Sequence, residues 1–205
     1  MDAAALLAKL DLRAKAGQLF VSWILSSSKP GSDKRKAMLS HVREVGLGGV
    51  ILSLGSVEEA ADLVTDLQAA APLPLLLASD FEGGVAARLS GACAMGNQML
   101  VGASGLSRLA RSMGEVTGDE ATALGIPWVF APVLDVNSNP SNPIINVRSF
   151  GADPAAVARL GSAFAQGVRS RGAMPCGKHF PGHGDVSSDS HLSLPTVPGD
   201  AARLR

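Results

Sequence analysis

Short apolar runs alternate with amphipathic, helix-like segments along the whole chain. Apolar residues three and four positions apart indicate the helices, and runs of a few consecutive apolar residues indicate buried strands. The predicted helices cover residues 2–16, 33–45, 56–70, 106–124 and 153–172, and the predicted strands cover residues 18–24, 48–52, 73–79, 128–134 and 173–179. This order predicts a parallel sheet with helical crossovers, which is an α/β fold.

Several predicted helices carry recognisable end signals. Ser56 followed by Glu59 has the form of a capping box, so we expect a helix to begin there. Asp153 and Pro154 form an N-cap and first-turn pair, and Gly172 ends the same helix. These signals support the element order given by the apolar pattern.

Polar residues recur directly after predicted strands, at Asp80 and Glu82, at Asp135, and at Lys178-His179. In a (β/α)₈ barrel the functional residues lie at the carboxyl ends of the strands. The first strand–helix turn has no Gly-x-Gly-x-x-Gly pattern, which disfavours dinucleotide binding. With five strands against a usual barrel length of roughly 250 residues, the sequence predicts a TIM-barrel-type (β/α)₈ domain over residues 1–205, truncated after about the fifth βα unit. Residues 198–205 read as the start of another helix.

Composition narrows the possible classes of function. The chain has 205 residues, 46% hydrophobic residues and a formal net charge of zero, which fits one globular domain and makes nucleic acid an unexpected partner. Cys93 and Cys176 provide no disulfide framework. The amino terminus lacks the features of a signal peptide, and no apolar run is long enough to span a bilayer. We therefore expect a cytoplasmic protein with no membrane partner.

The strongest candidate for chemistry is the segment Lys178-His179-Phe180-Pro181-Gly182-His183-Gly184-Asp185, followed by Asp189-Ser190-His191. Three of the four histidines fall within it. If Asp189 and His191 lie on an extended loop, their spacing points both side chains to one side, and the carboxylate can orient the imidazole as a general acid/base. Two other interpretations stay open: a metal site built from His183, Asp185, Asp189 and His191, and a solvated loop.

Five further positions carry candidate binding groups. Asp80 and Glu82 can bind sugar hydroxyls through charge-assisted hydrogen bonds, or can cap a helix. Arg148 can bind a ligand oxygen, or can tie down the long loop that precedes it. Lys178 and His179 end the last strand and can face the barrel mouth, although His179 can equally be a buried histidine with satisfied hydrogen bonds.

Several motifs together resemble bacterial β-N-acetylhexosaminidases of glycoside hydrolase family 3. The histidine segment and Leu194-Pro195 are similar to that family's signature. The other similar motifs, in the family's order, are Asp80-Phe81-Glu82-Gly83-Gly84, Ala131-Pro132-Val133-Leu134-Asp135-Val136 and Asn142-Pro143-Ile144-Ile145-Asn146-Val147-Arg148-Ser149-Phe150-Gly151. The similarity covers essentially the whole chain. Val85 departs from the arginine that many relatives carry at that position.

The resemblance implies a barrel hydrolase that retains configuration and releases terminal β-linked N-acetylglucosamine from muropeptide or chitin fragments. It implies His191 as general acid/base with Asp189 as its partner, and no cofactor or metal ion. The sugar-binding residues that it implies are Asp80, Arg88, Arg148, Lys178 and His179. The family's nucleophile is an aspartate after the seventh strand, which this chain does not contain. Binding without turnover and a metal-dependent hydrolase therefore remain alternatives, and an open barrel is expected to self-associate.

Overall fold

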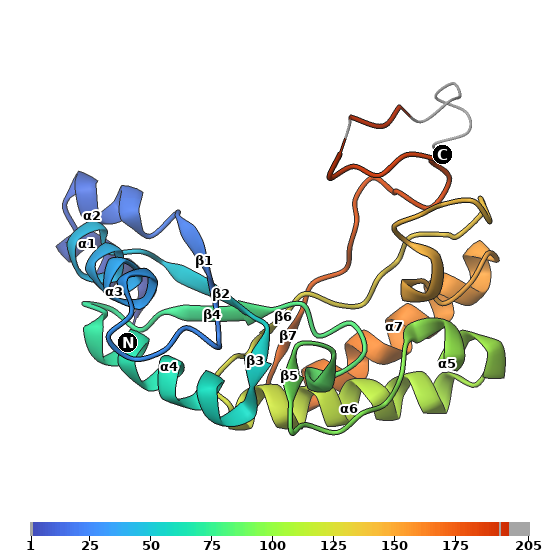
Figure 1. The fold of residues 1–205 in the computed structure, drawn as a ribbon, viewed down its shortest axis with the longest axis horizontal. Helices are drawn as coiled ribbons and strands as arrows, with labels where there is room; N and C mark the ends of the chain where they lie inside the picture. The colour runs from blue at the N-terminus through green and yellow to red at the C-terminus, as the bar shows by residue number, and fades with distance from the viewer. Residues whose placement is uncertain (1, 193, 197–205) are drawn as a thin grey trace.

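A curved parallel sheet, with helices along one of its sides, organises the chain (Figure 1). The computed structural model describes residues 2–192 and 194–196. In this part of the chain the main sheet has five strands in the order β1 (Val21–Leu25), β2 (Gly49–Ser53), β4 (Leu76–Ser79), β6 (Trp128–Val129) and β7 (Met174–Pro175). All the pairings are parallel. The spatial order follows the chain without the reversal typical of a doubly wound sheet, which confirms the predicted barrel-type fold.

Two helices, α1 and α2, precede β1, and the later helices lie between successive strands of this sheet. Their bounds are α1 (Ala3–Lys9), α2 (Leu12–Gly17), α3 (Asp33–Val45), α4 (Val57–Ala70), α5 (Gln98–Ser104), α6 (Ser107–Ala123) and α7 (Pro154–Ser170), and a small second sheet pairs β3 (Gly55–Ser56) with β5 (Leu89–Ser90). The prediction of one helix over residues 2–16 was wrong, because the Asp11 side chain accepts a hydrogen bond from Ala14 N and begins a new helix. The predicted helix at residues 198–205 lies outside the described residues.

The predicted helix ends are confirmed where the signals were strongest. Ser56 and Glu59 form the reciprocal capping box at the start of α4. Asp153 accepts a hydrogen bond from Ala155 N at 3.1 Å, with Pro154 in the first turn of α7. Gly172 follows the end of α7 with a φ of +80°, a conformation that glycine adopts at little cost. Helix α5 was not predicted.

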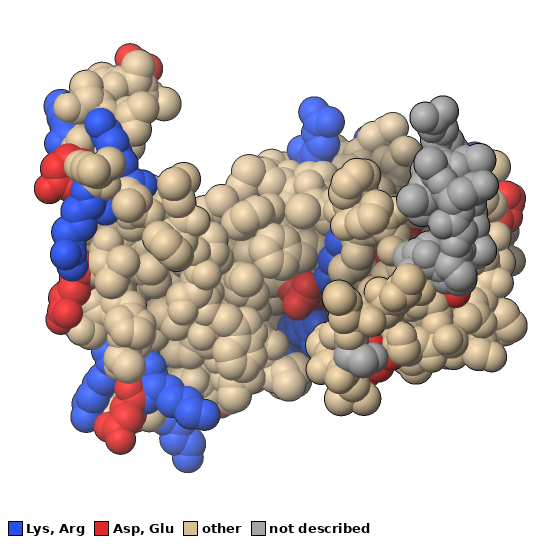
Figure 2. All heavy atoms as spheres, turned by 90° about the horizontal axis from the view of Figure 1, so that it is seen from above, with Lys and Arg blue, Asp and Glu red and all other residues tan. Residues whose placement is uncertain are grey.

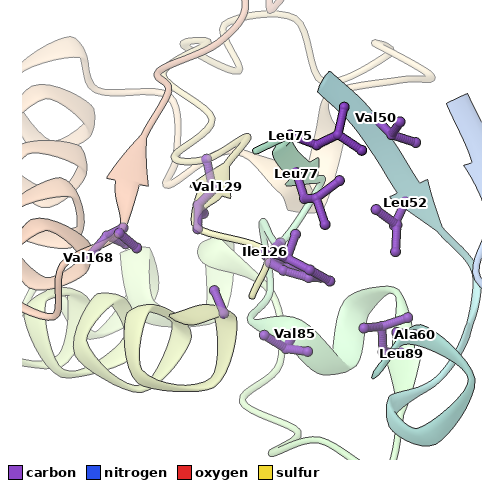
Figure 3. Packing of buried hydrophobic residues seen from close by; sticks show 14 of the residues in the cluster. Val50, Leu52, Ala60, Leu75, Leu77, Val85, Leu89, Ile126, Val129 and Val168 are labelled. Carbon is purple, nitrogen blue, oxygen red and sulfur yellow. The ribbon is translucent and has the colours of Figure 1, made fainter. Parts of the chain in front are cut away.

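The two faces of the sheet differ in burial. Ile24, Leu52 and Val129 are 4%, 1% and 0% exposed and belong to the core between strands and helices (Figure 3). The inner face carries a row of residues that pair across the strands: Trp23, Ile51, Ala78, Trp128 and Met174. At the two ends of this row Trp23 is 55% exposed and Met174 is 43% exposed. Self-association through these edges stays a prediction, which size-exclusion chromatography would check.

The last two strands are shorter than predicted. Their regular pairing ends at Val129 and Pro175, and Pro132, which has no N–H group to donate, follows shortly after β6. Pairing resumes in a single parallel bridge between Val133 and Lys178. This bridge carries Lys178 to the carboxyl edge of the sheet, where the polar side chains gather. Among the described helices, none combines the length and the apolar character that crossing a bilayer requires.

Candidate functional site

A cavity of about 450 Å³ lies at the carboxyl edge of the sheet. Its lining comes from segments far apart in the sequence: Asp80, Arg88, Ile144, Arg148, Lys178, His179, His183, Ser190 and His191. Figure 2 shows positive and negative side chains side by side in a hollow of this face, surrounded by a mostly uncharged surface. The carboxyl ends of parallel strands meet at one edge, which is why residues from distant segments converge here.

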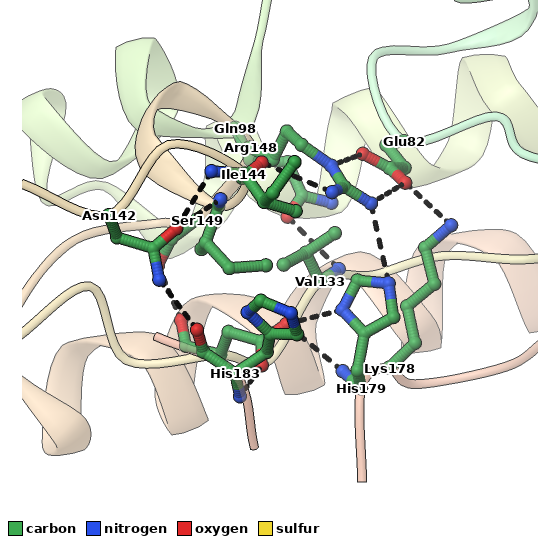
Figure 4. A network of polar contacts seen from close by, with 12 residues as sticks. Glu82, Gln98, Val133, Asn142, Ile144, Arg148, Ser149, Lys178, His179 and His183 are labelled. Carbon is green, nitrogen blue, oxygen red and sulfur yellow. Dashed lines mark hydrogen bonds and ion pairs between the residues drawn. The ribbon is translucent and has the colours of Figure 1, made fainter. Parts of the chain in front are cut away.

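Five charged side chains form a chain of ion pairs beside the cavity, and Figure 4 shows three of them, Glu82, Arg148 and Lys178. Lys178 Nζ lies 2.6 Å from Asp80 Oδ1 and 2.5 Å from Glu82 Oε1. Glu82 also accepts two hydrogen bonds from Arg148, from Nε and from Nη2, each at 2.8 Å. Arg88 Nη2 lies 3.4 Å from Asp80 Oδ2. Glu82 therefore sits at the centre of the network, which neither the helix-capping nor the sugar-binding interpretation of this residue predicts.

Burial and charge act in opposite directions on Glu82. Burial alone would raise the pKa of its carboxyl group, but the hydrogen bond from Arg148 and the charge of Lys178 outweigh this and lower the pKa to about 2. The hydrogen bond to Glu82 in turn raises the pKa of Arg148. Glu82 is consequently a carboxylate at any neutral pH and is a weak candidate for a proton donor.

Most of the five N–H groups of Arg148 contact other groups of the protein. Besides its two bonds to Glu82, Nη2 lies 3.3 Å from His179 Nε2, and Nη1 donates to Ile144 O at 3.2 Å. The contact with Ile144 ties down the loop before Arg148. The loop-anchoring interpretation of Arg148 is therefore correct, and the same side chain also lines the cavity.

His179 is held by a buried aspartate that follows β6. Its Nδ1 lies 2.6 Å from Asp135 Oδ2, and its backbone N donates to the same oxygen at 3.0 Å. Asp135 Oδ1 accepts from the backbone N of His183 at 2.5 Å. Burial would raise the pKa of Asp135, but the hydrogen bond with His179 contributes to a net lowering of that pKa. The Asp135 side chain is fully buried, so it supports the cavity wall and does not face a ligand.

Asp189 and His191 contact each other on the loop that follows. His191 Nδ1 lies 2.8 Å from Asp189 Oδ1, and the backbone N of His191 donates to the same oxygen at 2.8 Å. The expectation of an extended segment was wrong: Leu192 N donates to Asp189 O, which closes a turn. The backbone hydrogen bond from His191 is the first cause of a lowered pKa at Asp189. His191 lines the cavity together with Ser190, whereas Asp189 does not.

Two contacts attach this loop to the rest of the site. Asn142 is buried, donates to His183 O at 2.6 Å, and accepts from the backbone N of Ile144 and Ile145. Gly184 lies so close to Val136 O that no side chain would fit there. These contacts hold the segments that contain Val136 and Asn142 against the loop that contains His183 and Gly184, which sequence motifs alone could not show.

A larger cavity, of about 580 Å³, borders the same strand ends and is lined by Leu134, Gly177, Phe180 and Pro181, among others. Lys178 and His179 border both cavities. We assign the site to the smaller cavity because, of the two, only that one is also lined by Asp80, Arg88, Arg148 and His191. In the part of the chain that the structure describes, no group of three or more histidine, cysteine or acidic side chains is arranged to hold a metal ion.

The structure thus gathers Asp80, Arg88, Arg148, Lys178, His179 and His191 around one cavity. Their roles in binding and catalysis stay predictions. The family resemblance implies no role for Glu82 or Asp135, although both follow directly after predicted strands. The strand-end position was the available signal for them. What the sequence did not reveal was which strand-end residue contacts which.

Comparison with known proteins agrees with this geometry. The model of the glycosyl hydrolase family 3 N-terminal domain matches residues 11–205. A β-N-acetylglucosaminidase/β-glucosidase of Cellulomonas fimi is 38% identical over 187 residues, which are 91% of this chain and 32% of that protein.

Solved structures give the same result. A family 3 β-N-acetylglucosaminidase of Paenibacillus sp. aligns with a TM-score of 0.86 at 39% identity, over 95% of this chain and 38% of that one. NagZ of Neisseria gonorrhoeae, in complex with N-trifluoroacetyl-D-glucosamine, aligns with a TM-score of 0.76 at 32% identity, over 90% and 56%. The chain therefore spans about a third of the curated relative's length, and it belongs to glycosyl hydrolase family 3, whose N-terminal domain it carries.

Proposed function

We propose that this chain supplies the sugar-binding residues and the general acid/base of a retaining β-N-acetylhexosaminidase, which releases terminal β-linked N-acetylglucosamine from oligosaccharides. The observation that carries the proposal is the cavity that brings the Asp189–His191 pair together with Asp80, Arg88 and Lys178. One relative is named as a β-N-acetylglucosaminidase/β-glucosidase and another as a β-N-acetylglucosaminidase, which supports this substrate class.

Sugar binding would fall mainly to groups with unused hydrogen-bonding capacity. Lys178 has three N–H groups, and two of them point to Asp80 and Glu82. Asp80 is about one third exposed and keeps free lone pairs, and Arg88 lies beside it. Charge-assisted bonds from these groups suit vicinal hydroxyls. His179 and Arg148 would shape the same wall through their mutual contact.

His191 would transfer the proton at the glycosidic oxygen. Its Nδ1 is occupied by Asp189, and among the described residues its Nε2 has no partner, so that nitrogen is available to the substrate. An imidazole paired with a carboxylate suits general acid/base chemistry near neutral pH. Most retaining glycosidases use two carboxylates for this chemistry, so the histidine would replace one of them.

The nucleophile is proposed to come from outside this chain. Retention requires a carboxylate about 5 Å from the acid/base group. Asp135 is fully buried and accepts three hydrogen bonds, and Glu82 is neutralised by Arg148 and Lys178. Neither is free to attack a sugar carbon. We therefore predict that the 205-residue polypeptide alone does not hydrolyse an aryl β-N-acetylglucosaminide.

Hydrolysis of that glycoside by a protein carrying the complete barrel tests the function. Activity on the N-acetylglucosaminide that exceeds activity on the matching aryl β-glucoside is the expected result. Turnover in the presence of a chelator would remove the metal-dependent alternative. Turnover by the 205-residue chain alone would overturn the assignment of the nucleophile.

The second candidate is sugar binding without turnover, which the full engagement of Glu82 and Asp135 favours for the isolated chain. Titration of the chain with N-acetylglucosamine, followed by calorimetry, would measure it. Asp80→Asn should weaken binding, whereas Asp153→Asn, at the start of α7 and away from the cavity, should not. Binding that is lost equally in both variants would point to misfolding.

The natural source of the sugar and the location of the protein are also proposals. Muropeptides and chitin fragments both end in the required residue. Comparing initial rates on the two, with the complete protein, would separate them. A cytoplasmic location fits the free thiols of Cys93 and Cys176, and cell fractionation would test it.

A further inference from the structure

A single buried carboxylate, that of Asp135, determines the orientation and the tautomer of the His179 ring at the cavity. Asp135 follows β6 and its side chain is 0% exposed. Its two oxygens accept from three donors: the backbone N and Nδ1 of His179, and the backbone N of His183. These donors belong to the two ends of the turn at residues 179–183, so one side chain fastens the whole turn.

The opposite side of the His179 ring restricts it further. Nε2 lies 3.3 Å from Arg148 Nη2. An arginine nitrogen can only donate, so a hydrogen bond at this contact requires the Nε2 lone pair. The proton of the ring must then reside on Nδ1, where Asp135 accepts it at 2.6 Å. Both ring nitrogens are therefore committed to the protein.

We propose that Asp135 is a positioning residue for the sugar-binding wall, by which we mean the side of the cavity formed by His179 and Arg148. Asp135 fixes His179 as the Nδ1–H tautomer and thereby lets the ring accept a hydrogen bond from Arg148. The inference rests on the proposed function only for its effect on sugar binding. The tautomer itself is a property of the chain and can be measured without any ligand.

The three converging donors explain why a carboxylate is needed here. Asn at this position would offer one acceptor oxygen and one NH₂ group. If the oxygen faced His179, the NH₂ group would meet the backbone N–H of His183. If the oxygen faced His183, the NH₂ group would meet His179, and the imidazole would have to move its proton to Nε2. That proton would then point at the guanidinium of Arg148. Every arrangement breaks one contact of the wall.

The same carboxylate also fixes the start of the loop that carries the proposed acid/base. His183 begins the stretch that leads to Asp189 and His191. Asn142 holds the carbonyl of His183 while Asp135 holds its N–H. Asp135 therefore holds both the sugar-binding wall, through His179, and the loop that carries His191, through His183.

The decisive experiment measures the protonation of His179 by long-range ¹H–¹⁵N correlation in the ¹⁵N-histidine-labelled chain. His179→Gln assigns the signal among the four histidines. We expect the wild-type ring to show a protonated Nδ1 and an unprotonated Nε2. A ring protonated at Nε2, or at both nitrogens, would overturn the proposal, and this result needs no variant of Asp135.

Asp135→Asn then tests the cause. We expect a shift of the His179 ring towards Nε2–H or a mixture, and N-acetylglucosamine affinity lower by about 10- to 100-fold, the range seen for partners that orient metal-bound histidines. Asp153→Asn is the matched control, because Asn also caps helices well, and it should change neither. A folded Asp135→Asn chain with the wild-type tautomer and affinity within twofold would refute the proposal. If Asp135→Asn changes the tautomer of His179 but the wild-type chain binds no N-acetylglucosamine, the proposed function is refuted and the positioning role of Asp135 stands.

Discussion

Two histidines that line the same cavity are each paired with an aspartate, and the two pairs differ in how much of the protein surrounds them. His179 and Asp135 are 37% and 0% exposed in their side chains, and His191 and Asp189 are 75% and 25% exposed. The contacts have nearly equal length, 2.6 and 2.8 Å. The first pair joins two strand ends 44 residues apart, and the second joins residues two positions apart in one turn.

The difference separates two tasks. At His179 both ring nitrogens contact protein groups, so the ring can shape a wall but has no nitrogen left to exchange a proton with a substrate. At His191 only Nδ1 is occupied among the described residues, and exposure lets the ring reach a ligand. The buried pair is suited to positioning and the exposed pair to proton transfer.

Removing the His191 side chain from the exposed pair should cause the greatest loss of activity. In a protein with the complete barrel, His191→Ala should lower kcat by about 10²–10⁴-fold, since a general acid/base acts in the transition state. Steady-state kinetics on an aryl β-N-acetylglucosaminide would measure this, and N-acetylglucosamine affinity should change little.

His41→Ala provides the matched control, because His41 is an exposed histidine on α3, away from the cavity. A loss of sugar binding with an almost unchanged kcat in His191→Ala would contradict the division of tasks. It would make His191 a binding residue like its neighbours.

The next effect concerns stability and the network beside His179. Glu82 has its pKa lowered from 4.5 to about 2, so its ionised form stabilises the folded chain at neutral pH. Glu82→Gln should reduce the free energy of unfolding by roughly 3 kcal/mol, because it leaves Arg148 and Lys178 with a neutral partner. Urea unfolding followed by circular dichroism would measure the change.

The sign of the pH dependence follows from the lowered pKa. The contribution of Glu82 is fully present above the unfolded-state value near 4.5 and is lost as pH falls through the folded value of about 2. The stability of wild type should therefore fall more steeply than that of Glu82→Gln over this range. Glu44→Gln, at an exposed carboxylate on α3, should behave like wild type. Parallel pH curves for wild type and Glu82→Gln would show that the network is not coupled to folding.

The sequence predicted the fold better than the site. The alternation of apolar runs with capped helices is a local pattern, and it located the five strands and the helix starts at Ser56 and Asp153. It failed where the backbone departs from regular pairing, as beside Pro132, and where a polar residue begins a new helix, as at Asp11. Those outcomes depend on single hydrogen bonds that hydrophobic periodicity does not report.

For the site, the sequence predicted the local pair and the strand-end positions. Asp189 and His191 are two residues apart, so their contact could be anticipated, although for the wrong backbone shape. The contacts of Glu82 with Arg148 and of Asp135 with His179 span 66 and 44 residues. They depend on how the strand ends are staggered, which only the folded structure determines.

Removing the Asp189 side chain from the exposed pair should change turnover least. Asp189→Ala should lower kcat by only about two- to tenfold, because a carboxylate contact with a histidine that is largely exposed to water contributes little. Asp189→Asn should fall between that variant and wild type, since the amide oxygen can still accept from His191 N and Nδ1 but carries no charge. Added salt should reduce the rate of wild type more than that of either variant, because screening weakens only the charged pair. Steady-state kinetics at low and high ionic strength would measure all three proteins. A loss at Asp189 as large as that of His191→Ala would mean that this pair, too, works as a rigid unit, and the contrast with the buried pair would disappear.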